Sequence, residues 1–404
     1  MIGWCVKVYK SFHNPSYDYN YGYRRGVIVS AKTIYILGAG SSIGHSNNVF
    51  PSINQFFSKA KERGFYNNNG FYQLYKYVCK YFGEDIKTSE ALVNIEDVLS
   101  NIEIDIEKNS SPELLLTKKE TLNLIRKLLN ELSEDVLQER IINNGEYDLL
   151  KHRIFDTNKE ESKAKKNSST IITYNWDVMF DDLLGRKSLL DKSEKNTCVD
   201  YRYNDLYHDY SAKGEGTLGG ISLKAPYPNH NRNQNKGYYI KLHGSIDWFY
   251  CSNESCRVYN KVFPVLHPEE GLFCSYCHEY VNCMIVPPMI NKAYRQYPII
   301  RTLWNLAYKE ISVANTIVIW GYSLPPTDYY SKWLLRQACK KYLKHLVIIN
   351  KSVVKEKNRS NELNKDFINK FMYIFRDKFT KSSMKKSVEL YETFADYNDK
   401  KVEP

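Results

Sequence analysis

The chain has 404 residues and a formal net charge of +11, from 57 lysines and arginines against 46 aspartates and glutamates. Hydrophobic residues make up 43% of it and charged residues 25%, which excludes a wholly disordered protein and allows roughly two or three domains. No apolar run reaches the ~18 residues of a membrane helix, and the N-terminus lacks a signal-peptide pattern. We therefore expect a cytoplasmic protein without a membrane partner. The positive charge leaves a nucleic-acid partner open beside a plain compositional bias.

Five short runs predict the central strands of a parallel sheet. Each is apolar or nearly so on both faces, and each is followed by small or polar residues, as at strand ends that open into ligand-binding turns. The runs are Thr33–Leu37, Thr170–Thr173, Tyr238–Leu242, Thr316–Trp320 and Leu346–Ile349. Helical patterns lie between them, so the fold class is α/β.

A helical insertion is predicted between the first two strands, over about 51–160. Phe56 to Phe82 carries aromatic residues at helical spacing, and Leu114 to Ile142 fits one long or two shorter helices. Between them, Ser89 to Glu103 fits a helix whose apolar residues share one face. These residues are Leu92, Ile95, Val98, Leu99 and Ile102.

The remaining segments read as loops and extensions. We expect an N-terminal extension over 1–32, an exposed loop over 156–169 and a long loop or irregular lobe over 211–237. Residues 351–404 form a lysine-rich C-terminal extension, in which Phe367–Phe375 and Val388–Phe394 fit terminal helices.

A glycine-rich turn follows the first predicted strand, with the sequence Gly38, Ala39, Gly40, Ser41 and Ser42. Glycines in such a turn let backbone amides approach a phosphate, and a following helix adds partial positive charge. The motif is shorter than the full dinucleotide fingerprint, so a tight structural turn explains it equally well.

Polar residues also follow the second and third strands. Asn175 and Asp177 can point the same way from an extended segment and hold a water, a hydroxyl or a ribose, although Asn-x-Asp is more commonly a turn or a helix cap. His243 stands beside Gly244 at a strand end, where it suits a general base that titrates near neutral pH; the alternative is a structural histidine.

Two later strand ends repeat the pattern. Gly321 and Ser323 are suited to a phosphate or a ribose, while Asp328 is placed to cap the next helix. Asn350 ends the last strand, where a polar residue of a doubly wound fold commonly meets a nucleotide.

Nine cysteines occur in the chain, and five of them lie between 251 and 283. Cys251 and Cys256 form one pair and Cys274 and Cys277 a second, which matches the two knuckles of a tetrahedral structural zinc site. Cys283 and His278 are nearby alternatives as ligands, and a reduced cluster without metal is the other interpretation.

The order of these motifs resembles the sirtuin family. GAGSS, N-x-D, HG, the paired cysteines, G-x-S and I-N follow one another over about residues 33–351. Three segments look closer to the bacterial sirtuin-like domains of anti-phage defence. They are NIEDVLSNIE (94–103), KLHGSIDW (241–248) and GYSLPPTD (321–328).

The resemblance implies a Rossmann-like doubly wound parallel sheet with a helical insertion and a small zinc-bearing lobe. The NAD-binding catalytic domain would cover 33–350, with the lobe at about 248–284. Asn175 and Asp177 would flank the nicotinamide ribose, and His243 would be the catalytic base. The resemblance places the other NAD contacts at Gly38, Ala39, Gly40, Ser41, Ser42, Gly321, Tyr322, Ser323 and Asn350.

One segment departs from the deacylating sirtuins. Those enzymes follow the GAG-S motif with a G-I-P-x-F-R loop that covers the nicotinamide and helps to admit an acyl-lysine. Here Ile43 to Pro51 reads IGHSNNVFP and has no arginine. Defence-type relatives with this departure are NAD hydrolases. The resemblance therefore implies an NAD hydrolase that releases nicotinamide and ADP-ribose and depletes NAD in anti-phage defence.

Two alternatives remain open on the sequence. One is an NAD-dependent protein deacylase or ADP-ribosyl transferase, and the other is a non-catalytic sensor of NAD or ADP-ribose. The resemblance also suggests a homo-oligomer and, as in some relatives, a hexameric translocase ATPase as partner. The chain carries no G-x-x-x-x-G-K-[ST] loop, so such an ATPase would be a separate polypeptide.

Overall fold

The structure is a computed structural model. It describes residues 32–67, 70–87, 92–140, 145–155, 168–184, 199–200, 208–209, 216–217, 221–223, 238–259, 262–265, 272–274, 276–287, 297–326, 328–338, 342–354, 363–376, 378–379 and 387–399. The predicted loops over 156–169 and 211–237 and the extension over 1–32 lie almost wholly outside these ranges. Within 211–237, the described residues 216–217 and 221–223 are strands.

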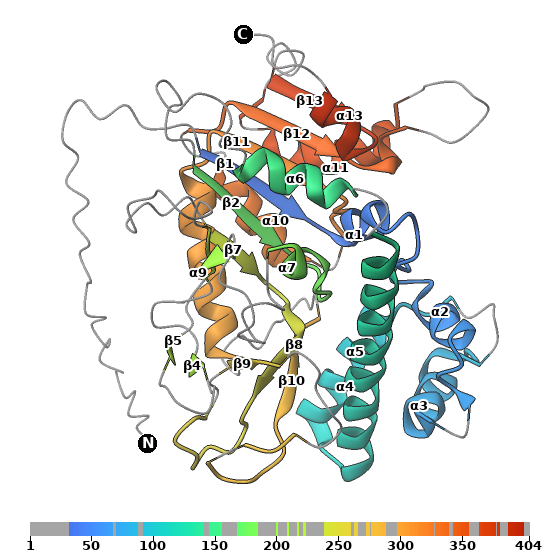
Figure 1. The fold of residues 1–404 in the computed structure, drawn as a ribbon. Helices are drawn as coiled ribbons and strands as arrows, with labels where there is room; N and C mark the ends of the chain where they lie inside the picture. The colour runs from blue at the N-terminus through green and yellow to red at the C-terminus, as the bar shows by residue number, and fades with distance from the viewer. Residues whose placement is uncertain are drawn as a thin grey trace, which may run out of the picture. The chain divides into compact units, whose positions relative to one another are not determined.

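Six parallel strands form the centre of the fold, in the order β13-β12-β11-β1-β2-β7 (Figure 1). They are β1 (Lys32–Leu37), β2 (Ser168–Thr173), β7 (Tyr238–Lys241), β11 (Thr316–Trp320), β12 (His345–Ile349) and β13 (Val388–Tyr391). The five predicted strands are confirmed. Because the chain builds outward from β1 in both directions, the sheet is doubly wound and Rossmann-like.

The register aligns the carboxyl ends of these strands. Leu37 pairs with both Trp320 and Thr173, while Thr173 pairs with Lys241 and Trp320 with Ile349. The residues that follow the five predicted strands therefore lie along one edge of the sheet, as the strand-end motifs require.

Short antiparallel strands extend and accompany this sheet. β6 (Ile221–Leu223) pairs with β7, and β3 (Val199–Asp200) pairs with β6. A separate three-stranded sheet has the order β10-β8-β9 and consists of β8 (Gly244–Tyr250), β9 (Val262–Pro264) and β10 (Asn282–Ile285). β4 (His208–Asp209) and β5 (Gly216–Thr217) form a two-stranded ladder.

Of the two predicted terminal helices, the first is confirmed and the second is wrong. α11 (Lys365–Phe375) is helical as expected, but Val388–Tyr391 is the edge strand β13, paired with Leu346–Ile349 of β12. All four residues of this edge strand are partly buried, so the strand shows no alternation between a buried and an exposed face. The helix α13 begins only at Phe394 and ends at Asp399.

The insertion is helical, as predicted. It consists of α2 (Phe56–Glu62), α3 (Tyr72–Phe82), α4 (Ile95–Asn109), α5 (Pro112–Arg140) and α6 (Glu146–Phe155). The side chain of Asn94 caps α4 by accepting from the Glu96 amide at 2.8 Å. Leu92 precedes this cap and is 77% exposed, so its predicted place on the buried face with Ile95 is wrong.

Helices cover both faces of the sheet (Figure 1). One face carries α6 and α7 (Met179–Leu183), and the other carries α9 (Pro298–Ser312) and α10 (Tyr329–Ala338). The inner strands bury most of their apolar side chains between these layers, whereas those of the edge strand β13 are partly buried. Within the described ranges, no helix has the length and hydropathy to cross a membrane.

Candidate functional site

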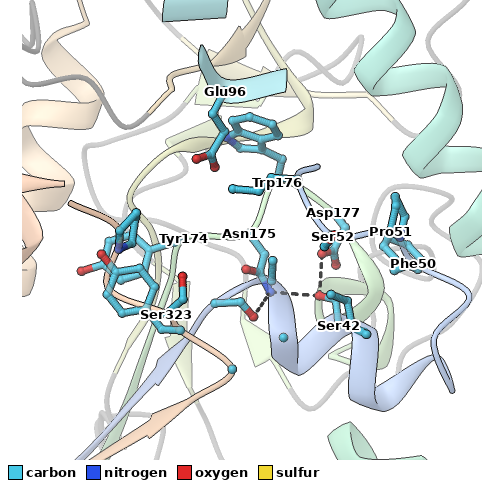
Figure 2. Close-up of a pocket in the computed structure, with 18 of the residues that line it drawn as sticks. Ser42, Phe50, Pro51, Ser52, Glu96, Tyr174, Asn175, Trp176, Asp177 and Ser323 are labelled. Atoms are coloured by element: carbon cyan, nitrogen blue, oxygen red, sulfur yellow. Dashed lines mark hydrogen bonds between the residues drawn. The ribbon is translucent and has the colours of Figure 1, made fainter. Parts of the chain in front are cut away.

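A cavity of about 350 Å³ opens at the carboxyl edge of the sheet (Figure 2). Its volume falls in the range of small-molecule sites, and its position is the usual one for ligands of doubly wound folds. Eleven of the predicted site residues line it: Gly38, Ala39, Gly40, Ser42, Asn175, Asp177, His243, Gly321, Tyr322, Ser323 and Asn350. Ser41 is the exception among the predicted residues outside the cysteine cluster, because it is fully buried behind the cavity.

The glycine-rich turn is shaped by the neighbouring strand end. The Gly40 amide donates to the Gly321 carbonyl at 2.8 Å, and the Gly38 amide donates to Trp320 at 3.0 Å. A Cβ atom on Gly321, whose φ is +67°, would lie 2.0 Å from the Ser41 nitrogen. Close packing of two backbone segments therefore explains these glycines. The predicted cradling of a phosphate by the Gly38 and Gly40 amides would need these bonds to open.

A buried hydrogen-bond network joins three elements beneath the cavity (Figure 2). The amide nitrogen of Asn175 lies 2.9 Å from Ser42 Oγ and 3.1 Å from the Gly38 carbonyl. Ser42 Oγ donates in turn to Asp177 Oδ2 at 2.7 Å. Within the described part of the chain, no group donates to Asn175 Oδ1, so the carbonyl oxygen is the atom of this side chain that is left for a ligand.

Both carboxylate oxygens of Asp177 accept hydrogen bonds from within the protein. Its second oxygen accepts from the Met179 amide at 3.1 Å, two residues on, which is the local turn that the sequence offered as an alternative. Burial raises the pKa of this carboxyl, and the nearby Lys241 ammonium acts in the opposite direction. In this structure, Asp177 holds Ser42 and the start of α7 in place.

His243 lies at the end of β7 and is almost completely buried. Its ring is flanked by Tyr174 and Trp304, with centroid distances of 5.2 and 6.3 Å. Gly244 then turns the chain with a φ of +76°, and a Cβ there would lie 2.0 Å from the Met284 carbonyl. The turn therefore requires glycine, and it presents the histidine to the cavity at a fixed position.

Two further polar residues act as local caps, which was predicted for Asp328 but not for Asn350. Asp328 accepts from the Ser331 amide and from Tyr322 Oη, at 3.2 and 2.8 Å. Asn350 accepts from the Ser352 amide at 2.9 Å and so caps the short 3₁₀ helix at Lys351–Val353. Both residues also line the cavity, so capping and ligand contact are compatible at these positions.

Sequence reasoning missed the other wall of the cavity. The segment before α2 supplies Phe50 and Pro51, and the N-terminus of α4 supplies Glu96 (Figure 2). Trp176 stands between the two predicted polar residues of its motif, and its indole nitrogen has no hydrogen-bond partner among the described residues. Its place inside the N-x-D motif is the one local signal that could have identified it.

The four predicted zinc ligands converge. The sulfur atoms of Cys251, Cys256, Cys274 and Cys277 all lie within 4.8 Å of one another. Two of the separations are 3.5 and 3.7 Å, close to the ~3.8 Å between thiolates that share a tetrahedral zinc ion. The donor set and spacing fit a structural zinc site with no open coordination position.

The nearby spare residues stand apart from this cluster. The sulfur of Cys283 lies 3.8 Å from the Ile246 carbonyl, and burial raises the pKa of its thiol to about 12. His278 is not among the converging ligands of the described chain. Neither residue replaces one of the four cysteines in this structure.

Comparison with known proteins gives a similarity in fold only. No family model matches the chain, and no curated protein matches it. A Sir2 homologue in complex with NAD has 13% identity and a TM-score of 0.38, over 92% of this chain and 88% of its own. A mutant Sir2 homologue in complex with ADP-ribose has 13% identity and a TM-score of 0.32, over 86% and 92%. These values assign neither a family nor an activity to the chain.

Proposed function

We propose that the protein is an NAD hydrolase that cleaves the nicotinamide–ribose bond and releases nicotinamide and ADP-ribose. The observation that carries the proposal is the meeting of Asn175 and His243 in one cavity, each at the end of a neighbouring parallel strand. Sequence motifs that resemble those of sirtuins thus come together at the edge of the sheet where doubly wound folds bind nucleotides.

The chemistry needs few groups, because the leaving nicotinamide departs neutral from a cation. The bond between ribose C1′ and the ring nitrogen breaks with both electrons going to the nitrogen, and water oxygen adds to C1′. The water loses a proton to His243, which acts as general base. Asn175 Oδ1 accepts a hydrogen bond from the same water or from a ribose hydroxyl and so orients it.

The wall around this site favours hydrolysis over deacylation. Where deacylating sirtuins are expected to admit an acyl-lysine, this chain places Phe50 and Pro51 in the cavity wall. The inserted helices add Ile95 and Leu129. These apolar side chains line the cavity and would hinder the approach of nucleophiles larger than water to the ribose.

The first test is nicotinamide release from NAD by the purified chain, without any peptide. We expect release with equal amounts of ADP-ribose. A strict requirement for an acylated peptide would instead identify a deacylase. Tight NAD binding without turnover would identify the sensor. Either of these two results would contradict the proposal.

The four converging cysteines are proposed to hold a structural zinc ion, and this gives a separate prediction. Cys274→Ser should reduce bound zinc from one ion per chain to almost none and lower the midpoint of thermal unfolding. Cys283→Ser is the matched control, because its sulfur lies outside the cluster, and it should keep its zinc. Metal analysis of both purified variants checks this; full zinc occupancy in Cys274→Ser would contradict the site.

We place the activity in anti-phage defence by NAD depletion, on the strength of the three sequence segments that resemble defence proteins. An enzyme that consumes NAD needs a gate, so assembly of several copies or a separate hexameric translocase ATPase would be the activating step. Loss of cellular NAD on phage infection, only in cells that carry the active protein, is the expected result. Unchanged NAD under infection would remove this assignment.

A further inference from the structure

We propose that Tyr147, on the inserted helix α6, is a positioning residue for NAD cleavage, an inference that rests on the proposed function. Its hydroxyl lies 2.8 Å from Ser41 Oγ, 3.0 Å from Ser42 Oγ and 3.4 Å from Asn175 Nδ2. The residue is 1% exposed and does not line the cavity, so it acts through Asn175 and the serines rather than on the ligand.

The number of hydroxyl protons determines which group donates and which accepts in each hydrogen bond of this network. Ser41 donates its one hydroxyl proton to the Gly38 carbonyl at 2.7 Å, and Ser42 donates its proton to Asp177. Tyr147 must therefore donate to a serine, and Ser41 is the nearer of the two. Both serine oxygens are then acceptors on the side that faces Asn175.

This direction decides which way Asn175 points. Its NH₂ group donates into the network, to Ser42 Oγ and the Gly38 carbonyl. A flipped amide would bring Oδ1 against acceptors whose protons are already used, which is unfavourable in a buried site. The network therefore holds Oδ1 toward the cavity, as the proposed chemistry requires.

The position of Tyr147 is fixed independently of its hydroxyl. Its amide donates to His45 Nδ1 at 3.1 Å, and its ring lies 4.4 Å from the ring of His45. Trp320 and Phe180 each pack edge-on at 5.2 Å. A Cβ on Gly145 would lie 2.4 Å from His45 Nδ1, so the start of α6 fits closely against the end of α1 (Ala39–His45). Tyr147→Phe can therefore remove the hydroxyl and leave the ring in place.

The matched control is Tyr77→Phe. Tyr77 is also buried, and its hydroxyl donates to Asp105 Oδ2 at 2.7 Å, but it lies on α3 and does not line the cavity. Loss of the hydroxyl and its hydrogen bonds should lower the thermal midpoint of both variants by a few degrees. Only Tyr147→Phe should change the turnover.

The experiment measures kcat and KM for NAD together with binding of ADP-ribose. For Tyr147→Phe we expect kcat to fall about tenfold, with KM and ADP-ribose affinity within about twofold of the native chain. In a double-mutant cycle, Tyr147→Phe combined with Ser41→Ala should lower kcat by less than the product of the two separate reductions. The reason is that both side chains act on Asn175 through the same hydrogen bonds.

Three results would overturn the inference, and the last of them can be told apart from the first two. Native kcat in Tyr147→Phe, or an equal loss in Tyr77→Phe, would make Tyr147 merely structural while leaving NAD hydrolysis intact. Absence of nicotinamide release from the native chain, both purified and in phage-infected cells, would remove the proposed function and this inference with it.

Discussion

His243→Ala should release nicotinamide from NAD about 10²–10⁴ times more slowly than the native chain, because the water or ribose hydroxyl loses its general base. The ring follows β7 and lines the cavity, so the substitution removes a group that would contact the reacting atoms. Initial rates of nicotinamide release under saturating NAD measure the effect.

The control for this variant is His345→Ala. His345 is exposed and begins β12, at the opposite end of the strands from the cavity. It should keep the native rate. A thermal midpoint of His243→Ala close to that of the native chain would show that the loss is catalytic. Native turnover in His243→Ala would exclude it as the base.

Lys241→Met should destabilise the fold by about 3–5 kcal/mol, because it leaves a buried carboxylate without its cation. Lys241 Nζ lies 2.9 Å from Asp181 Oδ2, and the two side chains are 1% and 4% exposed. The same ammonium donates to the Asp177 carbonyl at 2.6 Å and restrains the rise in the Asp177 pKa that burial causes. The variant should therefore also raise the Asp177 pKa further.

Urea unfolding followed by circular dichroism measures this cost. Lys59→Met is the matched control: Lys59 pairs with Glu62 at 2.9 Å on the surface of α2, and its loss should cost less than about 1 kcal/mol. Lys241→Met combined with Asp181→Asn should recover part of the stability, because no uncompensated charge remains. A cost below about 1 kcal/mol in Lys241→Met would contradict a strong buried pair.

Local sequence patterns were sufficient for the core of the fold. Each central strand is a continuous apolar run, and each ends in a distinct polar motif, so the strand positions and the residues at the strand-end side of the cavity could be predicted together. The four cysteines of the cluster could also be predicted, because a zinc site imposes a spacing of its ligands that is visible in the sequence. In all these cases, the physical constraint acts over a few neighbouring residues.

The missed features depend on contacts between distant segments. Tyr147 reaches Ser42 across 105 residues, and nothing in its own segment distinguishes it from other aromatic residues of the insertion. The Gly40 amide donates to the Gly321 carbonyl. This contact makes the glycine-rich turn a site of close backbone packing, which the sequence of the turn alone does not reveal. The strand β13 was mistaken for a helix because four residues are too few to distinguish a period of two from one of 3.6.

The contacts of Glu146 have a consequence for the order in which the protein is made. This residue adjoins Tyr147, and its carboxylate accepts from the amide of Phe394, 248 residues later in the chain. Phe394 is fully buried, and its ring lies 4.5 Å from that of Trp320. When every strand-end motif through Asn350 has been synthesised, the chain therefore still lacks Phe394 and its contacts with Glu146 and Trp320. The final arrangement of α6 beneath the cavity therefore needs the segment from Asn350 to Phe394 as well as the strand-end motifs that line the cavity.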